Sequence, residues 1–178
     1  MKKHFPSVVT TAAKTAVITA VATKLSRSLA AGALAIATSG FVATVSAEDA
    51  QIIELTQVHC QFVESENDVD HGFESAKKQD CEAIHGKSGA DRLAASKVME
   101  LKPGKYIFRV TNVDVEYPLG FYLRGEGLLG KARLPKVSGG GLTKGVTKDY
   151  EITLTEGDYE YSCPLNSTLD YKLKVSES

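Results

Sequence analysis

Three cysteines offer the clearest chemistry in the sequence, and they are Cys60, Cys81 and Cys163. In an oxidising compartment two of them are expected to form a disulfide, and three thiols allow three single pairings, among which sequence alone cannot choose. Cys60 with Cys81 is the most local pairing, and it would close a loop worth about 3 kcal/mol of stability. That pairing leaves Cys163 as an odd thiol whose role needs an explanation.

Two histidines share a polar, charged segment with Cys81. His71 and His85 are fourteen residues apart, a spacing that is not typical of a metal site, so each is read most simply as a solvated loop histidine. No Gly-x-Ser-x-Gly motif marks a serine nucleophile, and the stretch Gly86-Lys87-Ser88 has Cys81 where a phosphate-binding loop needs its first glycine. We therefore expect that the protein is not an enzyme.

The charge of the chain is divided unevenly along its length. The first 47 residues carry five bases and no acid, which leaves 16 bases and 22 acids for residues 48–178. An acidic body without a basic stripe argues against a nucleic-acid partner. Its size is that of one ordinary domain with a core of its own.

Residues 1–47 have the pattern of a secretory signal peptide. A basic stretch precedes an uncharged run of small and apolar residues, and Val45-Ser46-Ala47 offers a cleavage site before the first acids. An uncleaved anchor and an acid-poor transit peptide are the alternatives. The expected mature chain, 48–178, contains no stretch typical of a membrane span, so we expect a periplasmic or secreted protein.

Most of the mature chain alternates hydrophobic and polar residues over short stretches, which is typical of half-buried strands. In 51–63 this period-two pattern places Val58, Cys60 and Phe62 on one face. The pattern Leu-x-x-Gly-x-Tyr occurs twice, at 101–106 and 154–159, and glycine-rich turns separate the stretches. The prediction is an all-β fold, an antiparallel Greek-key β-sandwich or barrel. The expected strands lie at 51–63, 106–111, 119–124, 150–154, 159–161 and 171–175.

One segment, about 64–98, lacks strand character and is too long for a plain hairpin loop. It contains His71, Cys81 and His85, and the stretch 90–99 has the composition of a helix. We interpret it as an insertion with structure of its own, pinned to the first strand by Cys60–Cys81.

The C-terminal stretch, together with 101–112, resembles the cupredoxin or blue-copper family. A strand ends in Cys163, a tight loop Pro164–Asp170 follows, and a last strand closes the sheet. The resemblance covers most of 51–175 apart from the insertion. It implies the plastocyanin-like cupredoxin fold, in which a thiolate, two imidazoles and a weak thioether bind copper for electron transfer.

The family's other copper ligands are replaced in this chain. The resemblance puts the second histidine three positions after Cys163, where Asn166 stands, and the methionine eight positions after it, where Tyr171 stands. The first histidine would follow Pro118, where Leu119 stands. The resemblance therefore implies the fold and argues against a type 1 copper site.

Three interpretations of Cys163 remain. It is a buried or disulfide-bonded cysteine on a copper-free scaffold, it joins His71 or His85 from the insertion in an unusual metal site, or it exchanges disulfides without a Cys-x-x-Cys partner. The first leads to an accessory or binding protein of the cell envelope, linked to metal handling or electron transfer, with no cofactor. The second leads to a copper-binding electron carrier or chaperone. Tyr117, Phe121 and Tyr122 either fill the core or form an apolar patch that docks a protein partner.

Overall fold

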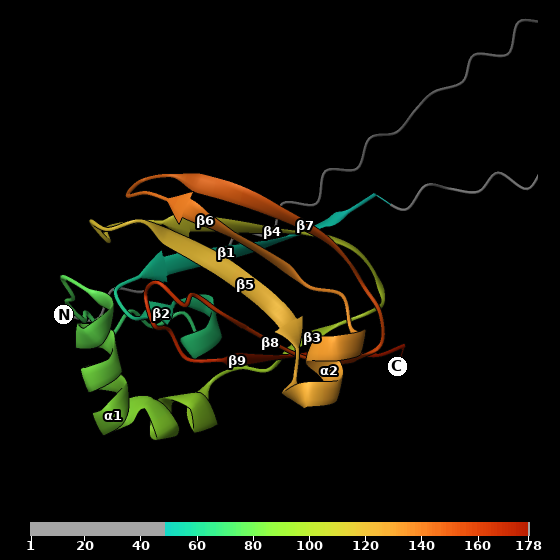
Figure 1. Ribbon diagram of the computed structural model, residues 1–178, viewed down its shortest axis with the longest axis horizontal. Coiled ribbons are helices and arrows are strands. Elements are labelled where there is room, and N and C mark those ends of the chain that lie inside the picture. Colours follow the sequence, from blue (N-terminus) through green and yellow to red (C-terminus); the bar gives the residue numbers. More distant parts are fainter. Residues whose placement is uncertain (1–48, 178) are drawn as a thin grey trace, which may run out of the picture. The chain divides into compact units, whose positions relative to one another are not determined.

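Two β-sheets face each other in the computed structural model, which describes residues 49–177 (Figure 1). The predicted signal peptide, 1–47, lies outside the described residues. The first sheet has the order β2-β1-β4-β7, with strands Gln61–Phe62, Gln51–Val58, Gly104–Asn112 and Thr147–Leu154. The second sheet has the order β3-β9-β8-β5-β6, with strands Met99–Leu101, Tyr171–Val175, Gly157–Ser162, Leu119–Gly125 and Val137–Leu142. In the described part, no helix is both long enough and apolar enough to cross a membrane.

This arrangement confirms the predicted β-sandwich with an insertion, and it adds two parallel pairings. β1 pairs in parallel with β4, and β3 pairs in parallel with β9, while the other described ladders are antiparallel. Parallel neighbours need a long connection, which the insertion between β2 and β3 supplies for β1 and β4.

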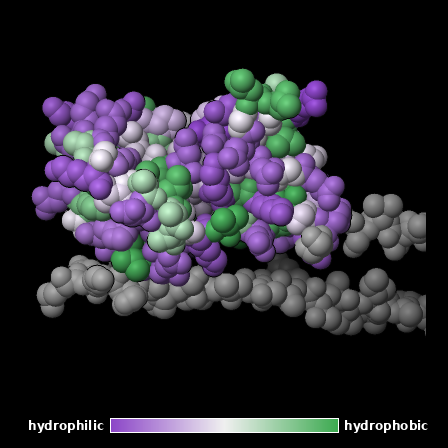
Figure 2. Space-filling view, turned by 90° about the horizontal axis from the view of Figure 1, so that it is seen from below, coloured by the Kyte–Doolittle hydropathy of each residue, from purple (hydrophilic) through white to green (hydrophobic). Residues whose placement is uncertain are grey.

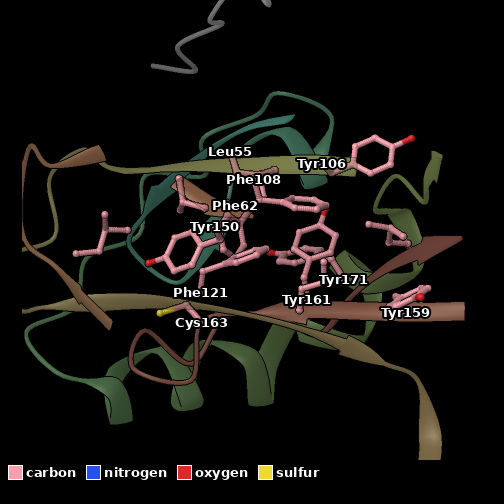
Figure 3. Packing of buried hydrophobic residues seen from close by; sticks show 14 of the residues in the cluster. Leu55, Phe62, Tyr106, Phe108, Phe121, Tyr150, Tyr159, Tyr161, Cys163 and Tyr171 are labelled. Carbon is pink, nitrogen blue, oxygen red and sulfur yellow. The ribbon is translucent and has the colours of Figure 1, made fainter. Parts of the chain in front are cut away.

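The core lies between the sheets and is rich in aromatic rings. Phe108 of β4 stacks on Phe121 of β5 with ring centroids 5.5 Å apart, and Phe62 meets Tyr161 edge to face at 5.7 Å. Figure 3 shows these rings between the two sheets, with Cys163 beside Phe121 at the edge of the cluster. Burial of these large rings contributes a large share of the hydrophobic stabilisation of the sandwich, beside the leucines and valines of the core.

The repeated Leu-x-x-Gly-x-Tyr pattern corresponds to two equivalent turns. The hydroxyl of Tyr106 donates to the carbonyl of Lys102 at 2.8 Å, and the hydroxyl of Tyr159 donates to the carbonyl of Thr155 at 2.9 Å. Each tyrosine thus closes the turn that precedes its own strand, β4 or β8, while its ring packs in the core.

The prediction of one strand over 51–63 was wrong. The chain reverses at His59 and Cys60, where Cys60 has a φ of 65°, and β2 runs back along β1. Val58, Cys60 and Phe62 therefore do not lie along one face of a single strand. A period-two pattern does not report a reversal between two strands that are both buried.

The helix of the insertion is longer than expected and begins earlier. α1 spans Lys78–Ala95, after a short 3-10 helix at Glu64–Glu66, and Met99 already belongs to β3, so the helix predicted at 90–99 was misplaced. The Asp80 carboxylate accepts hydrogen bonds from the backbone N–H groups of Ala76 and Lys77, which fixes the first turn. Two glycines and scattered charges in 78–89 hide this helix from a hydrophobic pattern.

Two further elements were missed. The glycine run 139–141, one of the glycine-rich stretches that the sequence predicts as turns, lies in the edge strand β6. Helix α2, Gly127–Arg133, follows β5 (Figure 1). Glycine is poorly represented in strands, so the pattern of β6 points to a turn.

Candidate functional site

The disulfide predicted between Cys60 and Cys81 is present, and both residues are fully buried. It ties the β1–β2 turn to the first turns of α1, 21 residues further along the chain. The insertion is therefore covalently fixed to the first sheet, as expected from the sequence.

Cys163 is the free cysteine of the described chain, and it is completely buried after the end of β8. Its sulfur accepts hydrogen bonds from the backbone N–H groups of Gly120 and Asn166, both at 3.3 Å. Burial raises the pKa of the Cys163 thiol, although the two N–H groups oppose this effect. The group therefore stays a neutral thiol at neutral pH, which is the less nucleophilic and less metal-binding form.

Asn166 stands where the resemblance would place a histidine ligand, and its side chain is occupied by the protein. Its amide nitrogen donates to the carbonyl of Val58 at 2.8 Å. Its amide oxygen accepts from the N–H of Cys60 at 3.1 Å and from the hydroxyl of Tyr117 at 3.0 Å. The side chain thus holds the β1–β2 turn against the loop that follows β8.

The two remaining ligand positions also hold other chemistry. Leu119 is fully buried in the hydrophobic core, and the hydroxyl of Tyr171 donates to the carboxylate of Glu66. The four ligand positions therefore hold a neutral thiol, an engaged amide, a hydrocarbon and an engaged phenol, which does not fit the soft trigonal site that holds type 1 copper.

His71 and His85 have partners that differ from those of Cys163. His71 Nε2 lies 2.7 Å from a carboxylate oxygen of Glu66, and His85 Nε2 lies 3.1 Å from the carbonyl oxygen of Cys60. Burial lowers the pKa of His85, so its neutral form is favoured. The contacts of the described residues do not join these three side chains, and among 49–177 no group of three His, Cys, Asp or Glu residues could hold a metal ion. The metal site at Cys163, His71 and His85 stays a prediction.

A buried ionic cluster joins the insertion to the sandwich. Both carboxylate oxygens of Glu66 accept hydrogen bonds from Arg92 of α1, and Glu66 also accepts from Tyr171 of β9. Burial raises the pKa of Glu66, but the hydrogen bonds from Arg92 and Tyr171 and the charge of Arg92 outweigh it, so the pKa lies below its ordinary value. Sequence reasoning missed this cluster, because nothing in the spacing of these residues marks them as neighbours.

Tyr117 takes part in a second polar contact between the sandwich and the insertion. Ser75 Oγ lies 2.8 Å from the hydroxyl of Tyr117 and 2.8 Å from His59 Nδ1. Of the three aromatic residues singled out in the sequence, Tyr117 therefore holds the insertion and Phe121 fills the core, while Tyr122 lies half-buried with the Arg124 guanidinium 4.6 Å from its ring centroid.

A shallow, mostly apolar hollow lies beside the Cys163 loop. It has a volume of about 410 Å³ and is open to solvent on one side. Leu165, which is 47% exposed, borders it, and the backbone of Gly120 separates it from the thiol of Cys163. The hollow is lined by Gly120, Phe121, Tyr122, Ser138, Gly139, Gly140, Pro164 and Leu165.

The two facing sheets, with Cys163 between the last two strands, form the β-sandwich that the sequence predicted. No protein-family model and no curated protein sequence matches the chain. Solved structures similar to it include auracyanin B, with 12% identity over 71% of this chain and 89% of that one and a TM-score of 0.44. Auracyanin A, a "blue" copper protein of Chloroflexus aurantiacus, has 15% identity over 72% of this chain and 100% of its own, with a TM-score of 0.39.

An amicyanin variant is similar at 17% identity over 73% of this chain and 88% of that one, with a TM-score of 0.37. These low identities and TM-scores carry no conclusion about copper or about function. What this chain can do is decided by its own residues at 117–121 and 163–171.

Proposed function

We propose that this chain is an exported, cupredoxin-like binding protein of the cell envelope that works without a type 1 copper centre and is not an enzyme. The observation that carries the proposal is the use of Asn166, whose amide holds Val58 and Cys60 at the position of a copper ligand. A metal carrier leaves its ligating side chains available to the metal, whereas the amide of Asn166 is bonded to the disulfide-bearing turn.

Because the loop after β8 is held by Asn166 and offers no metal ligand, we take the apolar hollow beside it as the surface best suited to a protein partner. Its lining is glycine backbone, aromatic edge and the exposed Leu165 side chain, with few charged groups. An apolar side chain of a partner protein that entered it would remove Leu165 from water, and such buried central anchors supply most of the binding energy of protein interfaces. In this proposal the partner is an envelope protein that handles metal or transfers electrons.

Site-specific photo-crosslinking in cells that produce the protein tests this function. A benzophenone amino acid at Leu165 is expected to form an adduct with one envelope protein, and Leu165 is 47% exposed. The matched control is the same probe at Val98, which is 48% exposed and lies outside the lining of the hollow. Equal adducts from both positions, or none from Leu165, would argue against a docking role for the hollow.

Export is tested on the same cells. The protein from the envelope or medium is expected to have the mass of a chain that begins at Glu48, because the predicted cleavage follows Ala47. A full-length product that stays in the cytoplasm would contradict the envelope assignment.

A further inference from the structure

Helix α2 presents two consecutive leucines to solvent. Leu128 is 90% exposed and Leu129 is 69% exposed, the two highest values among the large hydrophobic residues that the structure describes as exposed. Figure 2 shows hydrophobic residues standing out from a mainly hydrophilic face of the molecule. Exposed single apolar residues are common, but two adjacent leucines on one short helix form an apolar patch, and such patches often bind another molecule or a membrane.

The leucines are held in place by a rigid base. The backbones of Gly125 and Gly130 touch, so closely that a Cβ on Gly125 would lie 2.4 Å from the carbonyl carbon of Gly130. The N–H of Glu126 donates to the carbonyl of Asp158 at 2.8 Å, and Leu134 packs against Gly157. The protein therefore fixes α2 on β5 and β8 while it leaves Leu128 and Leu129 outside the core.

The surroundings of the leucines are basic, although the mature chain is acidic. Residues 126–136 hold three of the 16 bases of 48–178, Lys131, Arg133 and Lys136, and one of its 22 acids, Glu126. Glu126 is neutralised by Lys172, with 2.7 Å between Nζ and Oε1. Arg133 and Lys136 are exposed and have no ion-pair partner among the described residues. Lys131 is paired with the carboxylate of Glu160 at 3.3 Å, so the unpaired charges of 126–136 are the two bases Arg133 and Lys136.

We propose that α2 docks the protein onto the surface of an anionic lipid bilayer. Leu128 and Leu129 enter the boundary between headgroups and acyl chains, and Arg133 and Lys136 meet the negative headgroups. Two exposed leucines followed in the same segment by two exposed, unpaired bases are complementary to such a surface in both respects. This inference is independent of the proposed function, since α2 does not line the hollow at Leu165.

Vesicle co-sedimentation tests the proposal with the protein as expressing cells process it. Wild-type protein is expected to bind vesicles of equal parts phosphatidylglycerol and phosphatidylcholine, and to bind pure phosphatidylcholine vesicles at least about tenfold more weakly. The double substitution Leu128→Ser/Leu129→Ser is expected to lower binding to the anionic vesicles by about tenfold or more. Arg133→Gln/Lys136→Gln is expected to lower it in the same direction and to weaken its dependence on salt.

The control is Ile52→Ser/Val113→Ser, which removes two hydrophobic side chains that are 49% and 44% exposed elsewhere on the surface. It should bind anionic vesicles like the wild type. Urea unfolding midpoints verify that each variant is folded. The proposal is overturned if the wild type does not bind anionic vesicles, as would be the case if α2 served an acidic protein partner. It is equally overturned if the two leucine substitutions leave binding unchanged.

Discussion

The side-chain amide of Asn166 donates to the backbone carbonyl of Val58 at 2.8 Å, across 108 positions of the chain. This hydrogen bond joins the loop after β8 to the end of β1. The same side chain accepts from the N–H of Cys60, whose φ of 65° makes the tight reversal to β2. The side chain of Asn166 is thus a structural clamp between the loop that follows β8 and the β1–β2 turn.

Replacing Asn166 tests this clamp. Asn166→Ala removes the buried hydrogen bonds that the side chain makes to the Val58 carbonyl and the Cys60 N–H, so we expect the free energy of unfolding to fall by about 1–3 kcal/mol. Urea denaturation followed by circular dichroism measures the change. The matched control is Thr147→Val, which removes an exposed hydrogen bond to the Thr111 hydroxyl and should cost less than about 1 kcal/mol. Equal losses in both variants would contradict a clamping role.

The buried carboxylate of Glu66 gives a second prediction. Glu66→Gln keeps the shape but removes the charge that faces Arg92, which leaves a buried guanidinium uncompensated. Breaking a buried pair in this way costs about 3–5 kcal/mol. Glu82→Gln is the control, because Glu82 and Lys78 form an exposed pair one helical turn apart, and its loss should change stability by less than about 0.5 kcal/mol. A small effect of Glu66→Gln on the urea midpoint would mean that the cluster does not fasten the insertion.

The disulfide gives a third prediction. Cys60→Ser/Cys81→Ser opens a loop with a sequence separation of 21 and should lower the free energy of unfolding by about 3 kcal/mol. Reduction of the wild type should lower the urea midpoint to that of the double variant. If reduction lowered it further, another thiol linkage would have to exist.

The thiol of Cys163 should be inert in the folded protein. It is fully buried and its pKa is raised by burial, so a thiol reagent at pH 8 should label no cysteine in the native mature protein and one after denaturation. As the pH rises, the Cys163 thiol ionises in the unfolded chain before it does so in the folded protein. The contribution of the neutral thiol to the free energy of unfolding is therefore fully present below the ordinary pKa of 9.0, and it is lost as the pH rises through the higher pKa of the folded protein. Rapid labelling of the native protein would place Cys163 at the surface.

His85 predicts a loss of stability in mild acid. Burial lowers its pKa below the ordinary value of 6.5, so the unfolded chain takes up the proton first. The neutral imidazole therefore contributes to the free energy of unfolding above pH 6.5, and this contribution is lost as the pH falls through the lower pKa of His85 in the folded protein. His85→Gln should therefore show a flatter dependence of the urea midpoint on pH between about 7 and 5 than the wild type. If the urea midpoints of the wild type and of His85→Gln depended on pH in the same way, His85 would not be the group that causes the loss of stability.

Most of the sandwich could be predicted from the sequence, because hydrophobic and polar residues alternate wherever a strand has one buried face and one face toward solvent. Tyr106, Phe108 and Val110 of β4 and Tyr171, Leu173 and Val175 of β9 are buried at every second position, as expected. β6 could not be predicted, because its glycines carry no side chain to report a buried face. The reversal at Cys60 was also hidden, because both residues of β2 are buried.

The candidate site was predicted less completely than the fold. The pairing of Cys60 with Cys81 followed from proximity in the chain, and the family resemblance directed attention to Cys163 and Asn166. The cluster of Glu66, Arg92 and Tyr171 joins residues up to 105 positions apart and leaves no local signal. The clamp at Asn166 is likewise a long-range contact, which only the three-dimensional structure reveals.

A copper titration of the purified mature protein tests the central claim most directly. Cu(II) and Cu(I) are added separately up to several equivalents while visible absorption is recorded, and free thiols are counted on the same samples, for the wild type and for Cys163→Ser. The structure predicts no intense thiolate-to-copper band at one equivalent and the same weak binding in both proteins, because Cys163 is neutral and Asn166 is engaged. An intense band at one equivalent that disappears in Cys163→Ser would contradict a copper-free module and make the chain a metal carrier.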